Sequence, residues 1–481
     1  MIIVSITGPT MEDAISQMKV SRRTADLFEL RLDLIRNPDI IGLLGASGRP
    51  VITTCRTVAH GGKFRGAAHD RLTMLRLASA LGSAYIDLEY PQDSDHAAEM
   101  ADQKNEAGII LSHHTNKRPA KSLLASMSAL HPSVVKLAYH CSDSFEIRYA
   151  IDFLQSAAKA KQPAVAIATG EAGEASRVLY RKFGGWGTFA APEAGSPAAD
   201  GQIPASVLRK TFRADTLGAG TRVFGVIGTP LVQSRGTELH NPLFRRASVN
   251  AVYCRFPVKN LSRFMADLAP FLDGFSVTIP HKGAIVSYLD NVDPDAAKIG
   301  AVNTVVRQSG GLRGTNTDGI GALDALEESG PVRGMRMLVM GAGGAARAII
   351  WEARARGARV CVANRTAARA RKLAKEFGVE VILATQIGRT EFDILVNATS
   401  LGMVPRSDVS PFQKRYLTGK RVFDVVFNPP VTRLMTEAKQ AAATVIPGTE
   451  MYVRQAAEQS LLYAGRKPSL RSVRKMLGYD A

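Results

Sequence analysis

The sequence predicts an α/β protein whose first 212 residues form a (β/α)8 barrel, followed by a second α/β domain and a Rossmann-type domain. Three observations lead to this prediction. At 481 residues, the chain is too long for one ordinary hydrophobic core. Early in the chain, short apolar runs alternate with helical patterns at a spacing of about 25 residues. Near residue 340, a strand, a glycine-rich turn and a helix follow one another.

The composition is typical of a soluble globular protein, with 46% hydrophobic and 22% charged residues. No stretch approaches the roughly 20 apolar residues of a membrane span, and "MIIVSITGPTMEDA" lacks a basic region before its short apolar run. We therefore expect a cytoplasmic protein without a membrane partner. The four cysteines fit a reducing compartment and lack metal-site spacing, so no metal site is predicted. They are Cys55, Cys141, Cys254 and Cys361.

The net charge of +18 is concentrated in the second part of the chain. Residues 1–212 contain 24 basic and 21 acidic residues, whereas residues 213–481 contain 37 and 22. A nucleic acid is a reasonable first candidate for a basic region of this kind. However, its arginines are dispersed among helical patterns with few nearby aromatic residues, and no long basic run occurs. We expect a phosphorylated or carboxylated small molecule instead, and no nucleic-acid partner. The sequence makes no prediction about oligomeric state.

The eight expected barrel strands are short apolar runs, and most are separated by helical patterns such as "HDRLTMLRLASAL". In a parallel barrel of this kind, chemistry belongs at the carboxyl ends of the strands. The runs are Ile2–Ile6, Leu27–Leu32, Val51–Cys55, Ala84–Leu88, Gly108–Leu111, Val134–Ala138, Ala164–Ala168 and Trp186–Ala190.

Polar residues occur at or just after the ends of several of these strands. One polar strand end would carry little information, but seven polar residues from six separate segments predict a common site at one mouth of the barrel. For the first two residues, a buried structural ion pair is the alternative. The seven residues are Glu29, Arg31, Arg56, Glu89, His114, Lys136 and Arg177.

Lys136 stands in the middle of the apolar run "PSVVKLAYH". Burying an unpaired ammonium group is costly, so this lysine must reach solvent, pair with an acid or lose its proton. In the last case, its free amine could attack a ketone and form a Schiff base. The strand alone leaves these alternatives open.

After "RADTLGAGT", which we interpret as a linker at residues 213–220, the pattern restarts with the strand "VFGVIG". We expect a substrate domain over residues 221–325, completed by residues 450–481. A Rossmann domain is expected over residues 326–449.

The segment "MRMLVMGAGGAARAIIWEARARGARVCVANRT" predicts a dinucleotide-binding unit. Gly341 permits the tight turn, Gly343 allows close approach of a pyrophosphate, and Ala346 takes the place of the third glycine. The next strand ends in Arg365, between Asn364 and Thr366, where NAD-binding proteins carry an acid. An arginine there suits the 2′-phosphate of NADP. The predicted turn residues are Gly341, Ala342, Gly343, Gly344 and Ala345.

Two charged residues outside that unit suggest proton transfer. Lys282 ends "SVTIPHK", and Asp318 lies within "GTNTDGIG". Brought together, they could pass a proton to a carbonyl oxygen while the cofactor delivers hydride. Each residue alone is more often a surface charge.

The second part of the chain resembles shikimate dehydrogenases over nearly its whole length. The shared motifs, in family order, are "SVTIPHK", "GAVNTVV", "GTNTDGIG", "GAGGAAR", "NRT", "NATSLGM" and "GTEMYVRQAAEQ". The resemblance implies that Lys282 and Asp318 form the catalytic pair, that Arg365 selects NADP, and that Thr399 and Met403 lie along the nicotinamide. It also implies that shikimate is held by Ser234, Thr278, Asn303, Thr317 and Gln455.

The first part resembles type I 3-dehydroquinate dehydratases through "ELRLD", "YIDLEY", "LSHHT", "VVKLA", "EASRVLY" and "DGQIP". This resemblance makes Lys136 the Schiff-base lysine and His114 the general acid/base, oriented by Glu89. It assigns the substrate carboxylate to Arg177. It also implies that the ring hydroxyls of the substrate are positioned by Glu29, Arg31, Arg56 and Gln202. Together, the two resemblances imply consecutive reactions from 3-dehydroquinate through 3-dehydroshikimate to shikimate.

The sequence departs from the two family patterns at four positions, none of which performs the bond chemistry. Gly236 stands where the second serine of a Ser-x-Ser pair is expected, and Thr237 is a candidate substitute. Phe427 replaces a tyrosine. In the dehydratase part, Ala198 replaces a serine and His60 replaces the glutamate of an "EGG" turn.

Two alternative functions remain from the sequence. A catabolic quinate dehydrogenase is expected to prefer NAD, which Arg365 disfavours. A metabolite-sensing regulator without catalytic activity would share much of this sequence, but the catalytic-type residues are retained and no helix-turn-helix or zinc module is evident.

Overall fold

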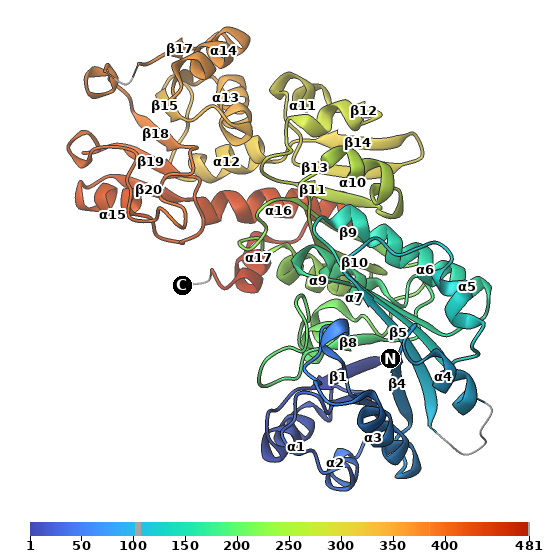
Figure 1. The fold of residues 1–481 in the computed structure, drawn as a ribbon. Helices are drawn as coiled ribbons and strands as arrows, with labels where there is room; N and C mark the ends of the chain where they lie inside the picture. Colours follow the sequence, from blue (N-terminus) through green and yellow to red (C-terminus); the bar gives the residue numbers. More distant parts are fainter. Residues whose placement is uncertain (102–106, 384, 480–481) are drawn as a thin grey trace. The chain divides into compact units, whose positions relative to one another are not determined.

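The computed structural model describes residues 1–101, 107–383 and 385–479 (Figure 1). The chain forms two compact units, residues 1–223 with 250–271 and residues 224–249 with 272–481. Among the described residues, no helix combines the length and the apolar composition needed to cross a lipid bilayer.

The first unit contains a nearly closed barrel of eight parallel strands in the order β7-β6-β5-β4-β3-β2-β1-β8. No ladder joins β7 to β8 among the described residues, but the amide of Trp186 donates to the carbonyl of Ala164 at 2.8 Å. The prediction of eight parallel strands is therefore confirmed, although the last strand is shorter than expected. The strands are β1 (Ile2–Ile6), β2 (Leu27–Arg31), β3 (Val51–Thr54), β4 (Tyr85–Glu89), β5 (Gly108–Thr115), β6 (Val134–His140), β7 (Ala164–Thr169) and β8 (Thr188–Ala190).

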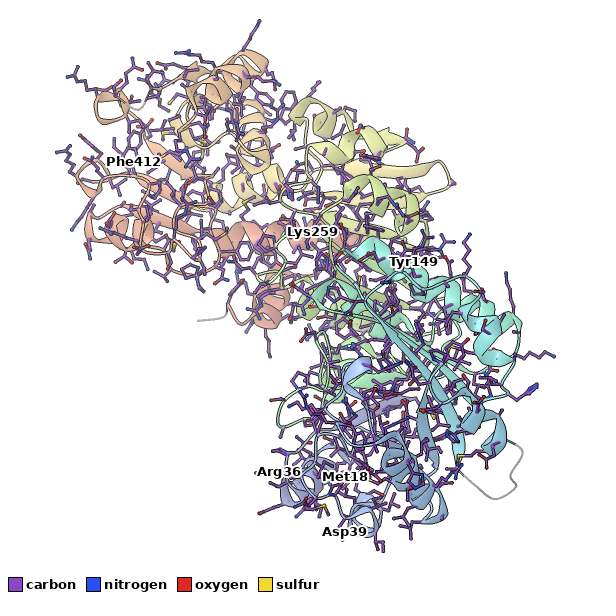
Figure 2. The ribbon with its side chains drawn as sticks, in the orientation of Figure 1. Met18, Arg36, Asp39, Tyr149, Lys259 and Phe412 are labelled. Atoms are coloured by element: carbon purple, nitrogen blue, oxygen red, sulfur yellow. The ribbon has the colours of Figure 1, made fainter. Side chains whose placement is uncertain are left out.

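Helices follow most of the barrel strands and bury one apolar face. In α6, the buried positions Ile147, Ile151 and Leu154 recur at helical spacing. Met18 is buried on α1, whose first turn is capped by the Thr10 side chain (Figure 2). The helices are α1 (Met11–Ser21), α2 (Ile40–Ser47), α3 (Ala68–Ala80), α4 (Ser94–Ala101), α5 (Leu123–Ser128), α6 (Ile147–Lys159), α7 (Glu174–Leu179) and α8 (Ala205–Val207).

The two-residue period of the strands divides the barrel interior into layers. An apolar layer, which includes Ile3, Leu27 and Ile110, lies toward the amino ends of the strands. Two residues further along β1 and β2, the register pairs Ser5 with Glu29. Between β5 and β6, it likewise pairs Ser112 with Lys136. The polar layer therefore lies toward the carboxyl ends, where the sequence predicted the site.

The segment predicted to be a linker lies against the barrel. Ala214 and Leu217 are buried. The Arg181 guanidinium donates to the carbonyl of Asp215 at 2.6 Å, and Lys182 donates to that of Ala219 at 3.0 Å. Residues 213–220 are thus anchored rather than freely hanging.

Residues 250–271 belong to the same unit as the barrel. Oδ2 of Asp143 accepts hydrogen bonds from the backbone amides of Asn260 and Lys259, at 2.7 and 3.1 Å. Glu174, at the start of α7, forms an ion pair with Arg255 at 2.9 Å. Lys259 is labelled in Figure 2. The barrel unit therefore uses two backbone donors and one side chain from a segment that follows it by some distance in the sequence.

A second, mixed sheet has the strand order β10-β9-β11-β13-β14-β12. Strand β11 is parallel to β9 and antiparallel to β13, so loops following β9 and β11 leave the same edge. The elements of this region are β9 (Arg222–Gly228), α9 (Gly236–Arg246), β10 (Ala251–Pro257), α10 (Leu261–Asp267), β11 (Gly274–Val277), β12 (Asn291–Val292), α11 (Pro294–Ile299), β13 (Thr304–Gln308) and β14 (Gly311–Thr315).

The third sheet is parallel throughout, with the order β17-β16-β15-β18-β19-β20. Along β15, Met337 and Val339 join one core, whereas Leu338 joins another core with Phe412 (Figure 2). The sheet is therefore covered on both faces, as in a Rossmann domain. Its strands are β15 (Arg336–Met340), β16 (Arg359–Ala363), β17 (Glu380–Val381), β18 (Ile394–Asn397), β19 (Arg421–Asp424) and β20 (Thr444–Pro447). The helices of this part are α12 (Asp318–Glu327), α13 (Gly344–Ala355), α14 (Ala367–Phe377), α15 (Arg433–Gln440), α16 (Gly448–Ala464) and α17 (Leu470–Leu477).

Candidate functional site

The lysine in the apolar strand is buried and paired with two acids. Nζ of Lys136 lies 3.0 Å from Oδ2 of Asp87 and 3.4 Å from Oε1 of Glu29. It also lies 3.8 Å from the centre of the Phe189 ring. Of the alternatives open to a buried lysine, the structure therefore shows pairing within a site at the carboxyl ends of the strands.

Asp87, which the sequence reasoning did not single out, is the centre of this cluster. Its carboxylate accepts from Arg56 at 2.7 Å and from the Ser112 hydroxyl at 2.6 Å, in addition to Lys136. Burial opposes its ionisation, but Arg56 and Lys136 outweigh burial and hold the pKa of Asp87 well below its usual range. The two-residue period provided a signal, because an inward-facing Glu89 implies an inward-facing Asp87.

A line of hydrogen bonds joins Gln202 to the lysine. Gln202 donates to the Ser5 hydroxyl at 3.3 Å, and Ser5 donates to Oε2 of Glu29 at 2.6 Å. Burial raises the pKa of Glu29, but the opposing effect of Lys136 and Arg31 is larger and the pKa is lowered overall. The group is therefore held as a carboxylate. The structure thus brings Gln202, Glu29 and Lys136 together.

His114 is buried beside two cations. Burial, and then Arg56 and Lys136, lower its pKa well below the ordinary value, although Asp87 acts in the opposite direction. The imidazole is therefore neutral at neutral pH and can accept a proton. Its Nδ1 is buried and has no hydrogen-bond partner among the described residues.

No hydrogen bond between Glu89 and His114, in which the carboxylate would accept from the imidazole, is found among the described residues. Oε1 and Oε2 of Glu89 accept instead from the amide and hydroxyl of Thr57, at 2.9 and 2.7 Å. The ring of His60 lies 6.0 Å from that of His114, and its Nε2 pairs with Gln92 at 3.0 Å. A second imidazole therefore occupies the neighbourhood of the predicted base.

The remaining two predicted arginines have different environments. Arg31 forms a bidentate pair with Asp33, at 2.8 and 2.9 Å, and not the alternative pair with Glu29. Arg177 is buried, and its Nη1 donates to the carbonyl of Phe189 at 3.0 Å. Burial lowers its pKa to about 10, partly offset by Glu174 and Glu29. Its Nε has no partner among the described residues, so this guanidinium retains a donor for an anionic ligand.

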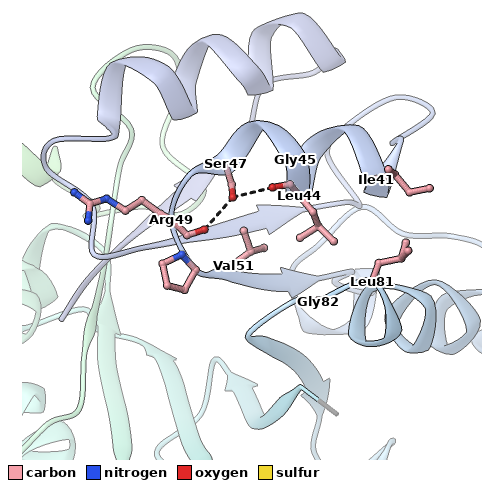
Figure 3. Close-up of a pocket in the computed structure, with 9 residues that line it drawn as sticks. Ile41, Leu44, Gly45, Ser47, Arg49, Val51, Leu81 and Gly82 are labelled. Carbon is pink, nitrogen blue, oxygen red and sulfur yellow. Dashed lines mark hydrogen bonds between the residues drawn. The ribbon is translucent and has the colours of Figure 1, made fainter. Parts of the chain in front are cut away.

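A cavity of about 390 Å³ lies at the opposite end of the barrel strands (Figure 3). Its wall includes Val51, where β3 begins, and Ser47, whose hydroxyl donates to the carbonyls of Leu44 and Arg49 at 3.0 and 2.9 Å. It contains none of the residues of the charged cluster. The chemistry of the barrel therefore does not belong to this cavity.

The second unit brings the predicted lysine and aspartate into direct contact. Nζ of Lys282 lies 2.5 Å from Oδ2 of Asp318, which begins α12. Oδ1 of Asp318 accepts from Asn303 at 2.7 Å, and its backbone amide donates to Asn316 at 2.9 Å. Both carboxylate oxygens are thus fixed, and the ammonium group keeps donors for a substrate oxygen.

Three more predicted ligands surround the same pair. The Asn303 side chain donates to the Thr317 hydroxyl at 2.9 Å and accepts from the Thr317 amide at 2.9 Å. Gln455, on α16, accepts from both residues at 3.4 and 3.5 Å. Gln459, one turn further along the helix, donates to Thr304 at 2.9 Å. The sequence reasoning missed Gln459, although its four-residue spacing from Gln455 puts both on one face of α16.

The loops after β9 and β11 carry the other two predicted ligands. The Thr278 amide donates to the carbonyl of Ile227 at 2.9 Å, and Ser234 Oγ accepts weakly from the Gly236 amide at 3.5 Å. Thr237 is buried, and its hydroxyl donates to Glu238 at 2.8 Å. Thr237 is therefore engaged elsewhere and is a poor substitute for the missing serine.

The glycine-rich turn fits a dinucleotide. Gly341 has φ +119, and a Cβ there would lie 2.7 Å from the carbonyl oxygen of Ala398. A Cβ on Gly343 would meet nothing within 4 Å, which leaves open space at the amino end of α13. A Cβ on Gly344 would lie 3.2 Å from Cδ of Lys282. The turn therefore borders the predicted catalytic pair, as hydride transfer requires.

The other cofactor candidates follow the neighbouring strands. Arg365 is exposed after β16, and Asn364 donates to the carbonyl of Thr366 at 3.0 Å. After β18, the Thr399 hydroxyl donates to Asn397 at 2.7 Å, and Met403 lies further along this loop.

Asp424, at the end of β19, is a further group that the sequence reasoning missed. It accepts from Asn397 and from the Thr432 hydroxyl, at 2.9 and 2.6 Å. Burial raises its pKa to about 6, although its hydrogen bonds with Thr432, Val426 and Asn397 lower it. Because Asn397 also holds Thr399, this carboxyl group helps to shape the loop after β18.

Three known families match successive parts of the chain. Type I 3-dehydroquinase matches residues 2–219. The shikimate dehydrogenase substrate binding domain matches residues 226–305, and the shikimate / quinate 5-dehydrogenase family matches residues 324–446. Lys136 falls within the first match and Lys282 within the second, whereas Asp318 lies between the second and the third.

Similar proteins extend this result to the arrangement of the whole chain. The chain is 34% identical to the chloroplastic bifunctional 3-dehydroquinate dehydratase/shikimate dehydrogenase of Arabidopsis thaliana, over 96% of this chain and 82% of that protein. It is 40% identical to the shikimate dehydrogenase (NADP(+)) of Methanocaldococcus jannaschii, over 53% of this chain and 95% of that protein.

Solved structures of similar fold cover the second part of the chain. A shikimate dehydrogenase in complex with NADP+ gives a TM-score of 0.51 at 37% identity, over 55% of this chain and 96% of that one. The enzyme from Thermus thermophilus, in complex with NADP(H) and shikimate, gives 0.50 at 32% identity, over 54% and 99%. Since the Arabidopsis relative spans both parts in one polypeptide, this chain belongs to the family of bifunctional 3-dehydroquinate dehydratase/shikimate dehydrogenases.

Proposed function

We propose that the chain catalyses two consecutive reactions, the dehydration of 3-dehydroquinate to 3-dehydroshikimate and the reduction of 3-dehydroshikimate to shikimate with NADPH. The observation that supports this most strongly is the pair of separate lysine-centred sites, one around Lys136 and one around Lys282. The substrates of the chain are small carboxylated molecules in this proposal, and no nucleic acid takes part.

In the first site, Lys136 attacks the ketone as a free amine, and loss of water gives an iminium ion. Neutral His114 then removes a proton from the adjacent carbon, which leaves an enamine. The resulting imidazolium returns the proton to the departing hydroxyl, which leaves as water. Hydrolysis of the remaining imine releases product and restores the lysine.

The other barrel residues bind and orient the substrate in this proposal. Arg177, with its buried guanidinium, holds the carboxylate. Glu89 does not contact the substrate in this proposal, because its oxygens accept hydrogen bonds from Thr57. It holds the loop that contains Thr57 in place beside the site. The ring hydroxyls are positioned by Glu29, Arg31, Arg56 and Gln202.

In the second site, Lys282 donates a proton to the substrate carbonyl oxygen, while Asp318 holds the ammonium in place. NADPH supplies the hydride when bound. The fixed carboxylate and amide network around Asp318 orients the lysine toward the substrate. The substrate ring is held by Ser234, Thr278, Asn303, Thr317 and Gln455.

The cofactor assignment rests on the turn after β15 and on Arg365. The turn runs from Gly341 through Ala342, Gly343 and Gly344 to Ala345, and the open space beside Gly343, at the amino end of α13, suits a pyrophosphate. Arg365, flanked by Asn364 and Thr366, is an exposed cation able to pair with a 2′-phosphate. We place Thr399 and Met403 along the nicotinamide.

The expected domain boundaries stay part of this proposal: residues 1–212 for the dehydratase, 221–325 with 450–481 for the substrate domain, and 326–449 for the cofactor domain. A cytoplasmic location is likewise proposed, and four free, buried cysteines support a reducing environment.

One coupled assay tests the proposal as a whole. Purified enzyme is mixed with 3-dehydroquinate and NADPH, and nucleotide oxidation is followed together with shikimate formation. We expect both to proceed in equal amounts. Lys136→Ala should stop oxidation with 3-dehydroquinate but not with 3-dehydroshikimate. A wild-type enzyme that oxidised no nucleotide with either substrate would overturn the assignment.

A further inference from the structure

The proposed shikimate site lacks two hydroxyl groups that its family pattern leads us to expect. Gly236 has no side chain to offer, and Phe427 has a ring without a hydroxyl. Thr237 does not fill the gap, because its own hydroxyl donates to Glu238. Of the hydroxyl groups expected at this loop, that of Ser234 alone is retained, so a substrate carboxylate bound here gains from a donor on another element.

Tyr452 is a tyrosine in the first turns of α16, three residues before Gln455. Residues three apart lie on neighbouring positions of one helix face, so Tyr452 shares a face with a proposed substrate ligand. Its ring stacks on that of Phe427, with ring centres 4.8 Å apart and planes inclined by 14°. The aromatic position without a hydroxyl is therefore in contact with an aromatic residue that has one.

The surroundings of the Tyr452 hydroxyl locate it near the other missing group. Burial raises its pKa, and Tyr479 and Glu238 raise it further. The charge and the backbone amide of Arg235 act in the opposite direction. Arg235 and Glu238 lie on either side of Gly236 in the sequence, so the hydroxyl faces the loop that contains this glycine.

The loop in question is held in place from outside the site. The guanidinium of Arg235 donates to the carbonyl of Leu477 at 2.8 Å and lies 5.8 Å from the centre of the Tyr479 ring. These contacts tie Arg235, at the start of α9, to the end of the C-terminal helix α17. A hydroxyl brought to the loop by α16 therefore meets a defined surface rather than a mobile segment.

We propose that the hydroxyl of Tyr452 donates a hydrogen bond to the carboxylate of 3-dehydroshikimate and shikimate, in place of the groups absent at positions 236 and 427. The inference rests on the proposed reductase function of this site. A neutral phenol is a strong donor to an anion, and its stacked ring loses little further freedom when the substrate binds. In this proposal, Tyr452 contributes to the affinity of the enzyme for the carboxylate group of the substrate.

Tyr452→Phe in the full-length enzyme tests the proposal. We expect KM for 3-dehydroshikimate to rise about tenfold, which corresponds to the loss of one charge-assisted hydrogen bond of about 1.4 kcal/mol. In contrast, kcat, KM for NADPH and the dehydratase rate should change less than about twofold, because the hydroxyl is not expected to take part in the bond chemistry. Tyr288→Phe, an exposed tyrosine of the same unit, is the matched control.

Two further measurements distinguish a missing hydrogen bond from a disturbed structure. With the methyl ester of 3-dehydroshikimate as substrate, wild type and Tyr452→Phe should have similar KM values. Adding Gly236→Ser to Tyr452→Phe should recover much of the lost affinity, because it restores a hydroxyl at the same loop. If Tyr452→Phe does not fold, Gly236→Ser in the wild type decides, since a tenfold gain would show that no donor was present.

An unchanged KM in folded Tyr452→Phe would overturn the role of Tyr452, and so would an equal effect on the acid and on its ester. Both outcomes differ from failure of the proposed function, in which the wild-type enzyme would not reduce 3-dehydroshikimate at all.

Discussion

Nζ of Lys136 lies 3.0 Å from Oδ2 of Asp87, and the same oxygen accepts from Arg56 at 2.7 Å. Asp87 thus makes the shortest ion pair of each of two buried cations, whose second partners, Glu29 for Lys136 and Glu89 for Arg56, lie at 3.4 and 3.5 Å. An ammonium group is not a nucleophile, so this pairing describes the resting state of the lysine, and its proton must leave before the ketone is attacked.

Asp87→Asn is expected to lower the free energy of unfolding of the barrel unit by about 3 kcal/mol, because two buried cations lose their shared counter-ion. Ser112→Ala, which removes one neutral donor to the same carboxylate, should cost about 1 kcal/mol. Urea unfolding can be followed through Trp186 in a Trp351→Phe background, since the chain has only these two tryptophans. Equal losses in the two variants would contradict the central position of Asp87.

Borohydride added together with 3-dehydroquinate is expected to trap a covalent adduct on Lys136, located by mass spectrometry of the digested protein. His114→Ala should still allow trapping but slow dehydration by about 10²-fold or more, as is usual for the loss of a general acid/base. Lys161→Ala, on a surface turn, is the control and should leave trapping unchanged. An adduct on any other lysine would exclude the proposed Schiff base.

His240 should make the second unit sensitive to acid. Burial lowers its pKa from 6.5 to about 3, with the hydrogen bond to Gln459 acting in the opposite direction. Below pH 6.5, the unfolded chain binds a proton that the folded chain does not. The free energy of unfolding should therefore fall as pH decreases, by about 1.4 kcal/mol per pH unit from this residue alone.

The measurement compares wild type with His240→Gln between pH 6 and pH 4, by urea unfolding followed through Trp351 in a Trp186→Phe background. The variant should show the smaller slope with pH, whatever its stability at pH 7. Parallel slopes would mean that His240 titrates alike in the folded and unfolded states.

Arg365→Ala is expected to reduce the preference for NADP over NAD by one to two orders of magnitude, because a charge-assisted contact of roughly 1.5 to 3 kcal/mol is lost. The ratio of kcat/KM for the two nucleotides measures this preference. Arg369→Ala, another exposed arginine on the following helix, serves as the control for net charge. If both variants lowered the ratio equally, general electrostatic attraction would explain the selectivity.

The two activities should respond separately to point changes. Lys136→Ala should abolish only the dehydratase reaction, and Lys282→Ala should severely reduce only the reductase reaction, when each is assayed with its own substrate. Loss of both activities in either variant would show that the sites are coupled.

Cutting the gene near Gly218 is expected to give two soluble fragments, each with one activity. The first fragment lacks the backbone donors of residues 259 and 260, so it should be less stable than the barrel unit in the intact chain by about 2 kcal/mol or more. Asp143→Ala in the intact chain should reproduce most of this loss, as measured through Trp186.

Much of the barrel and its site could be predicted because parallel strands all end on the same face. Polar residues at strand ends, such as Glu29 and Lys136, therefore had to meet. The partner of a side chain was harder to predict than its position. Glu89 was expected to orient His114. Instead, the loop after β3 places Thr57 against the Glu89 carboxylate, which accepts hydrogen bonds from its amide and hydroxyl.

Contacts between distant elements could not be predicted from local patterns. Tyr452 and Phe427 are 25 residues apart, and their stacking depends on the angle at which α16 leaves β20. Likewise, a stretch of small residues at positions 213–220 suggested a free linker. Burial of Ala214 and Leu217 depends on the barrel surface beside it, which the stretch itself does not reveal.

The discontinuity of the barrel unit has a consequence for how the protein is made. A ribosome adds roughly 5–20 residues per second, so residues 1–223 emerge some seconds before residues 250–271. During that interval, the nascent barrel has its eight strands but lacks the backbone donors for Asp143 and the cation for Glu174. The barrel unit can therefore complete its folding only after the ribosome has begun to synthesise the second unit. Folding of the first unit and synthesis of the second overlap in time.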